Sequence, residues 1–471
     1  MTYNVKTDRI CTNCSNIFIG DSSVGQVSTG SYNNFFGLVA GQNNTSGSYN
    51  NFFGRFAGRC NTSGSSNNFF GACAGCRNTS GSYNNFFGRF AGQYNTTGYG
   101  NNFFGGFAGC CNTSGLYNNF FGSTAGMFNT TGSCNNFFGR DAGYRNTTGC
   151  YNNFFGYQSG YCNTTGSYNT FIGQCAGSRN TSGSCNIFIG QNAGFCNTNG
   201  CGNIFFGKCS GYFNTTGGAN NFFGESAGRS NTTAIYNNFF GQGAGERNTI
   251  GRSNNFFGAS AGGYNTTGVY NNFFGESAGK CNVSGSNNVN IGYESGFRNL
   301  GSHNIFIGCA SGYCNTTGFN NILIGCCSGR GATGLANITN QCHRIILGNS
   351  AHVCAQIQIG WTVVSDCRDK CIFGPVPHGR GFLQNIKPIE FSFIDRETGC
   401  LTDPEGKRRY GFSAQDVLKA EGENPVIVSN ENPEKLQITT DYLIPILINA
   451  VKELSEEVET LKSRVSELEK F

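Results

Sequence analysis

Cysteines recur along this chain of 471 residues at a few fixed spacings, which makes them candidates for disulfide or metal chemistry. Four pairs are 13 residues apart, two are 16 apart and one is 17 apart. The pairs are Cys60 with Cys73, Cys162 with Cys175, Cys196 with Cys209, Cys314 with Cys327, Cys134 with Cys150, Cys185 with Cys201, and Cys309 with Cys326. Recurrence of the same spacings within one chain indicates that these thiols are placed in pairs.

Zinc binding is the alternative use of the thiols. Cys11 with Cys14, and Cys73 with Cys76, have the spacing of zinc ligands. The repeat described next separates these two groups by about three coils, or ~14 Å, too far to share one ion. The four histidines are scattered. We expect no metal site and no cofactor.

A repeat positions the cysteines. A glycine recurs every 17 residues from Gly20 to Gly292, and steps of 16 and 17 extend the series to Gly325. The 19 resulting coils follow the template N-N-F-F-G-x-x-A-G-x-x-N-T-T-G-S-Y. Such a unit is too short for two helices, and short Phe and Ile segments between Gly and Asn turns are typical of strands. The sequence predicts a β-solenoid on the order of 90 Å long at ~4.8 Å per coil.

Stacked coils would bring the paired cysteines together, because equivalent Cα atoms of neighbouring coils lie about 4.8 Å apart, within disulfide range. We expect seven coil-to-coil disulfides, formed after assembly in an oxidising setting such as a mature virion. Whether a bridge lies within one chain or between chains stays open.

Adjacent phenylalanines, as in Phe52-Phe53, occur in 13 coils. Neighbouring strand residues point to opposite faces, so one ring faces the interior and the other faces out. The outer rings would form an apolar stripe far larger than a monomer tolerates, which favours a homo-oligomer around a common axis. The alternatives are a monomeric solenoid wide enough to bury both rings, and an amyloid-like stack.

Acceptor-type sequons recur at Asn44, Asn61, Asn78, Asn95 and later positions. Glycosylation would need a secretory route, and the N-terminus shows no signal peptide. We favour a structural role, in which these Asn side chains cap turns and form a hydrogen-bonded ladder. An ice-binding Thr face is a weaker alternative.

Charge is unevenly distributed along the chain. Only seven of the 26 Asp and Glu residues precede residue 330, and the other 19 follow Val364. The chain carries a net charge of +5 but contains no basic cluster that would indicate nucleic-acid binding. It also contains no run of 18 apolar residues, so the sequence does not predict a membrane-spanning helix.

Three motifs after residue 364 appear in a fixed order: "SDCRDK" at 365–370, "GRGFLQNIKPIEFSF" at 379–393 and "RRYGFSAQDV" at 408–417. With the helical end that follows, they resemble the C-terminal intramolecular chaperone domain of endosialidase-type tail spikes, found on phage and viral fibres. The resemblance covers residues 365–471. Asn-Thr-Gly repeats upstream are also similar to those of phage fibres and trimeric adhesin heads.

The resemblance implies self-cleavage between Val364 and Ser365 by a Ser–Lys dyad, a single-turnover serine endopeptidase activity. Ser365 would attack the carbonyl of Val364, and Lys370 would act as the base. A lysine can serve as a base once burial and a nearby cation lower its pKa. Arg368 would supply that cation, with Asp366 and Asp369 orienting the loop. Cys367 and Cys371 flank the lysine, so a bond between them would block or gate cleavage.

The last part of the sequence has a heptad pattern, with Val at position a and Leu at position d. The residues are Val451, Val458 and Val465 at a, and Leu447, Leu454, Leu461 and Leu468 at d. This composition favours two strands, whereas the resemblance and the shaft favour three, and we expect three. The alternative is an amphipathic helix packed on its own domain.

The predicted organisation is an attachment segment at 1–12, a solenoid shaft at 13–330, a β transition at 331–364 and a chaperone at 365–471, with the coiled coil at 446–471. The predicted fold class is a trimeric all-β solenoid of 17-residue coils followed by a small α+β chaperone domain ending in a coiled-coil helix.

We expect a homotrimeric fibre, made in the host cytoplasm and carried on a virion surface, that binds a virion attachment protein. A glycan-binding adhesin that grips a host-surface glycan is the alternative, and exposed tyrosines such as Tyr32, Tyr49 and Tyr83 would favour it. A glycosidase is disfavoured by the few carboxylates before Ser365.

Overall fold

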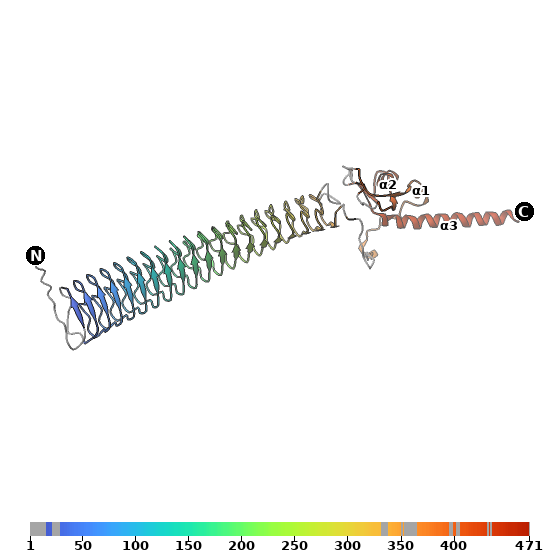
Figure 1. Ribbon diagram of the computed structural model, residues 1–471. Coiled ribbons are helices and arrows are strands. Elements are labelled where there is room, and N and C mark those ends of the chain that lie inside the picture. Colours follow the sequence, from blue (N-terminus) through green and yellow to red (C-terminus); the bar gives the residue numbers. More distant parts are fainter. Residues whose placement is uncertain are drawn as a thin grey trace. The chain divides into compact units, whose positions relative to one another are not determined.

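The computed structural model of the chain describes residues 16–20, 29–330, 338–349, 352, 365–394, 399–401, 406–430, 433 and 436–470. Two compact units divide the chain, Met1–Ser350 and Ala351–Phe471. The first unit is a stack of coils, and the described residues of the second form short strands, the α-helices α1, α2 and α3, and short 3₁₀ helices (Figure 1).

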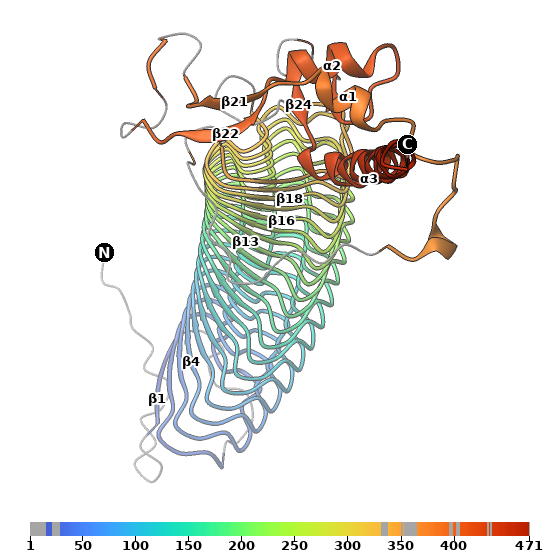
Figure 2. The ribbon, with the colours of Figure 1, turned by 90° about the vertical axis from the view of Figure 1, so that its right-hand side faces the viewer.

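The first unit is built on one sheet of 20 strands, each three residues long. Figure 2 shows coils of similar outline lying one behind another. The strands are β1 (Ile17–Ile19), β2 (Asn34–Phe36), β3 (Asn51–Phe53), β4 (Asn68–Phe70), β5 (Asn85–Phe87), β6 (Asn102–Phe104), β7 (Asn119–Phe121), β8 (Asn136–Phe138), β9 (Asn153–Phe155), β10 (Thr170–Ile172), β11 (Ile187–Ile189), β12 (Ile204–Phe206), β13 (Asn221–Phe223), β14 (Asn238–Phe240), β15 (Asn255–Phe257), β16 (Asn272–Phe274), β17 (Val289–Ile291), β18 (Ile305–Ile307), β19 (Ile322–Ile324) and β20 (Ile345–Leu347).

Every strand pairs in parallel with the strand of the next coil. In β1 and β2, Ile17 lies opposite Asn34, an offset of 17 residues that recurs along the stack. The offset is 16 between β17 and β18 and 23 between β19 and β20. The predicted parallel β-solenoid is confirmed, and its sheet extends to Leu347, inside the segment 331–364.

The interior of the solenoid is a column of phenylalanine rings. The middle residue of each strand from β2 to β19 is buried, and the rings of Phe52 and Phe69 stack with centroids 4.8 Å apart. Glycine is required beside this column, because a Cβ on Gly58, whose φ is 57°, would lie 2.5 Å from the Phe52 ring. The repeat glycine is required for a second reason: a Cβ on Gly54 would lie 2.6 Å from the carbonyl oxygen of Gly71.

A second column of side chains lies at the third strand position and faces outward. Phe53 and Phe70 stack at 4.7 Å, yet such residues are half-buried, and Phe206 is 51 % exposed. The prediction that one ring of each pair faces in and its neighbour faces out is confirmed.

Asparagine ladders tie the coils together. Asn61 donates its amide to Asn44 Oδ1 at 2.7 Å and to Gly64 O at 2.9 Å. Asn50 bonds Asn33 in the same way at a second buried position. The sequon asparagines Asn44, Asn61, Asn78 and Asn95 are buried, so the predicted Asn ladder is confirmed. Because these side chains are enclosed and bonded, the folded coil leaves no room for a glycan on them.

The second unit contains the remaining elements. They are the 3₁₀ helix η2 (Cys367–Asp369), α1 (Arg380–Gln384), β21 (Pro388–Phe391), β22 (Arg409–Phe412), α2 (Ala414–Glu421), β23 (Val428–Ser429), β24 (Gln437–Ile438), η3 (Thr440–Tyr442) and α3 (Leu443–Leu468). β21 pairs antiparallel with β22, and β23 with β24. Phe382, Val417 and Ile446 lie in its core. None of the helices in the described ranges is long and apolar enough to cross a membrane.

One coil departs from the pattern. Asn290 occupies the central position of β17, between Phe273 of β16 and Phe306 of β18. Its side chain is fully buried, and neither its Nδ2 nor its Oδ1 has a hydrogen-bond partner. An unpaired buried polar group costs about 1–3 kcal/mol, so this coil is a weak point in the stack.

We predict that Asn290→Phe raises the local free energy of opening around β17 by about 1–3 kcal/mol, because a ring removes the unpaired amide and completes the column. Hydrogen exchange of the β17 and β18 amides measures this directly.

The control is Asn288→Phe, since Asn288 is a bonded ladder residue that donates to Gly301 O at 2.9 Å. That variant is expected to lose protection. Faster exchange in Asn290→Phe would contradict our account of the column.

Candidate functional site

The motif 365–370 forms a short turn that joins a serine to a lysine. The carboxylate of Asp366 accepts from the backbone N–H of Arg368 at 2.9 Å and so caps η2. This turn brings the ends of the motif together, and Lys370 Nζ lies 2.5 Å from Ser365 Oγ. The predicted nucleophile and the predicted base are thus within hydrogen-bond reach of each other, which a Ser–Lys dyad would require.

Arg368 is engaged within the same turn. Its Nε lies 3.0 Å from Asp366 Oδ1, and its Nη2 lies 2.5 Å from Oδ2. These hydrogen bonds lower the pKa of the Asp366 carboxyl and raise the pKa of the Arg368 guanidinium. Asp366 therefore balances the charge of Arg368, and the expected role of Arg368 as the cation that lowers the pKa of Lys370 stays a prediction.

The dyad is open to solvent. Ser365 and Lys370 are both exposed. The segment 371–377 borders Lys370 in a shallow open hollow, and in it Ile372 is 74 % and Phe373 97 % exposed. Val364 and the side chain of Asp369 lie outside the described part of the chain. A lysine becomes an effective base when it is desolvated, so a covering surface is still needed.

A polar stripe on α3 anchors the end of this segment. Asn449 donates to the carbonyl oxygens of Val376 and His378 at 3.2 Å each. Glu453 accepts from the backbone N–H of Arg380 at 2.8 Å, and Glu457 pairs with the Arg380 guanidinium. Sequence reasoning missed these residues, although their spacing of four residues along a helix was a usable signal.

The cysteine pairs occupy neighbouring coils, as the sequence predicts, although all fourteen are free thiols in the structure. Cys60 N–H donates to Cys76 O, and Cys76 N–H donates to Cys73 O. Ser178 links Cys162 with Cys175 in the same manner, and Tyr212 links Cys196 with Cys209.

Two further pairs, Cys134 with Cys150 and Cys185 with Cys201, are also adjacent. The backbone N–H of Ser133, next to Cys134, lies 3.3 Å from Cys150 Sγ, and Ser184, next to Cys185, is equally close to Cys201 Sγ. Cys327 N–H donates to Cys309 O, and the sulfurs of Cys326 and Cys327 are 3.6 Å apart. Disulfide formation at these places stays a prediction.

Two cysteines outside the predicted pairs form a contiguous pair, Cys110 and Cys111. A hydrogen bond from the Cys110 thiol lowers the pKa of Cys111 from its ordinary value of 9.0 to about 7, while that bond and burial raise the pKa of Cys110. Among the described residues, no group of three His, Cys, Asp or Glu side chains is arranged to hold a metal ion. Cys11 and Cys14 lie outside them.

Two surfaces are apolar and uncovered in the single chain. One is the outer column of the shaft. The other is the heptad seam of α3, where Val451, Leu454, Val458, Leu461, Val465 and Leu468 are 43–73 % exposed. The threonine hydroxyls are not a free polar face, since Thr62 Oγ1 donates to Thr79 O at 2.9 Å and this bond recurs along the stack.

No known protein family matches the chain, and no curated protein and no solved structure matches it. The resemblance of residues 365–471 to the chaperone domain consequently rests on the three motifs and on the dyad geometry.

We predict that peptide mapping of the assembled protein without reductant will recover the seven cysteine pairs as linked peptides, because the two cysteines of each pair lie in neighbouring coils. Cys60 gives the most specific test, because either Cys73 or Cys76 could form the disulfide with it. In Cys60→Ser, thiol labelling is expected to rise at Cys73 or Cys76 and to stay unchanged at Cys175. Free thiols at all fourteen positions in the oxidised assembly would contradict the disulfide prediction.

Proposed function

We propose that the chain is a structural trimeric fibre protein of a virion surface, whose C-terminal domain drives trimerisation and then releases itself by cleavage between Val364 and Ser365. The observation that supports this most is the contact between Lys370 Nζ and Ser365 Oγ within the chaperone-like motif. Residues 1–12, the proposed attachment segment, lie outside the described residues.

The cleavage step uses groups within one turn. Lys370 takes the proton of the Ser365 hydroxyl, and Oγ attacks the carbonyl carbon of Val364. The new C–O bond replaces the C–N bond, and Lys370 returns the proton to the departing amine of Ser365. Water then hydrolyses the ester, leaving a carboxylate on Val364 and a free amine and hydroxyl on Ser365. No other reactant is required.

Trimerisation supplies the cover that the dyad lacks. The exposed side chains of Ile372 and Phe373 follow Lys370 directly, and the apolar seam of α3 is likewise uncovered. Association along that seam would bring copies of the 371–377 segment together and exclude water from the lysine. Cleavage is therefore coupled to assembly, so that only correctly assembled chains are processed.

Release gives the fibre kinetic stability. A shaft with equivalent coils does not fix its own register, because a slip of one coil replaces each side chain with a similar one. The chaperone aligns three chains, and its removal abolishes the reverse route to unfolding.

A receptor-binding fibre is the second candidate, supported by a column of exposed tyrosines. Tyr32, Tyr49 and Tyr83 are 52 %, 59 % and 64 % exposed, and Tyr32 stacks on Tyr49 at 5.0 Å. Exposed aromatic faces of this kind suit contacts with a host-surface glycan.

We predict that the wild-type protein yields two fragments that meet at residues 364 and 365, while Ser365→Ala and Lys370→Ala remain intact. Denaturing gels with and without reductant, followed by N-terminal sequencing of the smaller fragment, measure this. Lys419→Ala is the matched control, because Lys419 is an exposed lysine on α2 outside the turn.

A further arm tests coupling to assembly. Leu454→Asp with Leu461→Asp places charges in the seam and is expected to prevent cleavage although the dyad is intact, whereas Ser463→Asp, on the opposite face of the helix, is expected to cleave normally. Cleavage that persists in Ser365→Ala would contradict the proposed chemistry, and cleavage in the seam variant would contradict the coupling.

A further inference from the structure

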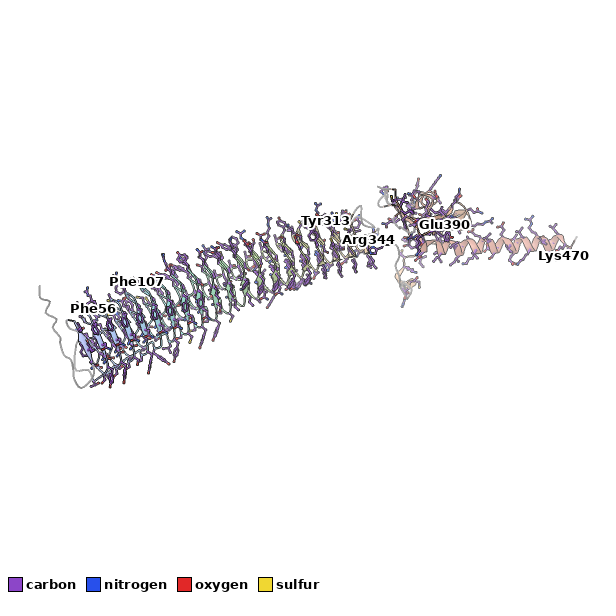
Figure 3. All side chains as sticks on the ribbon, viewed as in Figure 1. Phe56, Phe107, Tyr313, Arg344, Glu390 and Lys470 are labelled. Atoms are coloured by element: carbon purple, nitrogen blue, oxygen red, sulfur yellow. The ribbon has the colours of Figure 1, made fainter. Side chains whose placement is uncertain are left out.

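The cations of the shaft are concentrated in one part of the coil. Between residues 29 and 330 there are 12 Arg and two Lys against one Asp and four Glu. All the cations except Arg252 occupy the first, fifth or sixth place after a repeat glycine. These places belong to the turn that follows each strand, so the cations lie along one long edge, where Figure 3 shows Phe56, Phe107 and Tyr313.

The first part of this edge carries almost no compensating charge. Seven Arg and one Lys lie between residues 29 and 223, and Asp141 is the single acidic residue there. Asp141 is paired with Arg140 at 3.4 Å and accepts from Thr124. Lys208, at the end of this part, lies 3.9 Å from Glu225 of the next coil. We call the exposed residues Arg55, Arg77, Arg89, Arg140, Arg145 and Arg179 the arginine edge.

Aromatic rings hold the guanidinium groups of this edge. Arg77 lies over the Tyr94 ring at 4.5 Å, Arg89 over Phe90 at 4.7 Å, and Arg179 over Phe195 at 5.0 Å. A guanidinium stacked by its face keeps its N–H groups at the rim, where they can bind a carboxylate with two parallel hydrogen bonds. The stacking therefore orders the donors before a ligand arrives.

The spacing of the charges identifies the ligand class. Eight cations extend over about 43 Å, nine coil steps of 4.8 Å, or roughly one charge per 5 Å. Duplex DNA carries a phosphate charge about every 1.7 Å of its length, which this edge would leave largely unneutralised. The eight cations are spread unevenly over ten coils, four of which carry none, but their average density is close to that of a sugar chain with one carboxylate per residue. The interleaved rings suit contacts with sugar C–H faces.

We propose that the arginine edge binds a linear polysaccharide carrying about one carboxylate per sugar, lying parallel to the shaft. This inference rests on the receptor-binding candidate above and is independent of self-cleavage. In the proposed trimer the outer column at the strand end faces the axis, whereas the sixth-place residues Arg77, Arg145 and Arg179 lie further around the coil.

The test uses the full-length Ser365→Ala protein and polygalacturonate as the probe, with dextran, heparin and duplex DNA as comparison ligands. Affinity is measured by calorimetry at physiological salt. Arg77→Gln, Arg89→Gln and Arg179→Gln together are expected to weaken polygalacturonate binding about tenfold, from three exposed ionic contacts. The control removes the same charge elsewhere, by Arg252→Gln, Lys407→Gln and Lys419→Gln, and is expected to change affinity less than about twofold.

Equal loss in the two triple variants would overturn the inference, since net charge alone would then explain binding. Tighter binding of heparin or DNA than of polygalacturonate would also overturn it, because it contradicts the spacing argument. If the protein binds the neutral glycan dextran but does not bind polygalacturonate, the inference is also overturned, although the receptor-binding candidate is then still supported. Circular dichroism of each variant confirms that the shaft is folded.

Discussion

The stacking of identical side chains at the spacing of one coil is the interaction on which the rest of the shaft depends. Each coil has a three-residue strand, and the buried rings of successive strands lie about 4.8 Å apart. One such coil cannot enclose its own phenylalanine or satisfy its own asparagine, because the partners of both lie in the next coil. Stability therefore accumulates by nearest-neighbour contacts, as in other solenoids.

The same constraint creates the problem that the C-terminal unit is proposed to solve. A coil that needs an identical neighbour cannot distinguish one neighbour from another, so the repeat specifies a fold without specifying alignment between chains. The pleat that buries Phe52 also turns Phe53 outward, so the outer column is an unavoidable consequence of the core. The proposed aligned oligomer would answer both requirements, and the exposed heptad of α3 would offer a means to form it.

Most of the shaft could be predicted because its period is visible in the residues themselves. The alternation at Phe52-Phe53 and the ladder role of Asn61 follow from backbone geometry and from the 17-residue repeat. The burial of Asn290 was not predicted, because a single Asn in a short strand segment usually indicates a turn, and its burial depends on the coils on either side.

In the second unit, the contact of Ser365 with Lys370 agrees with the motif. The pairing of Arg368 with Asp366 was not foreseen, because either carboxylate of the motif was available to that arginine. The four-residue spacing of Asn449 and Glu453 indicated a polar stripe on the helix, but not its partners, because the contacts join residues more than 70 positions apart.

The account's central claim is that other copies of the chain cover the outer phenylalanine column. The most direct measurement is the mass of the intact Ser365→Ala protein in solution, by sedimentation equilibrium over a range of concentrations. The account predicts a single species of three times the chain mass of 50.4 kDa. A stable, soluble species of one chain mass at all concentrations would contradict it.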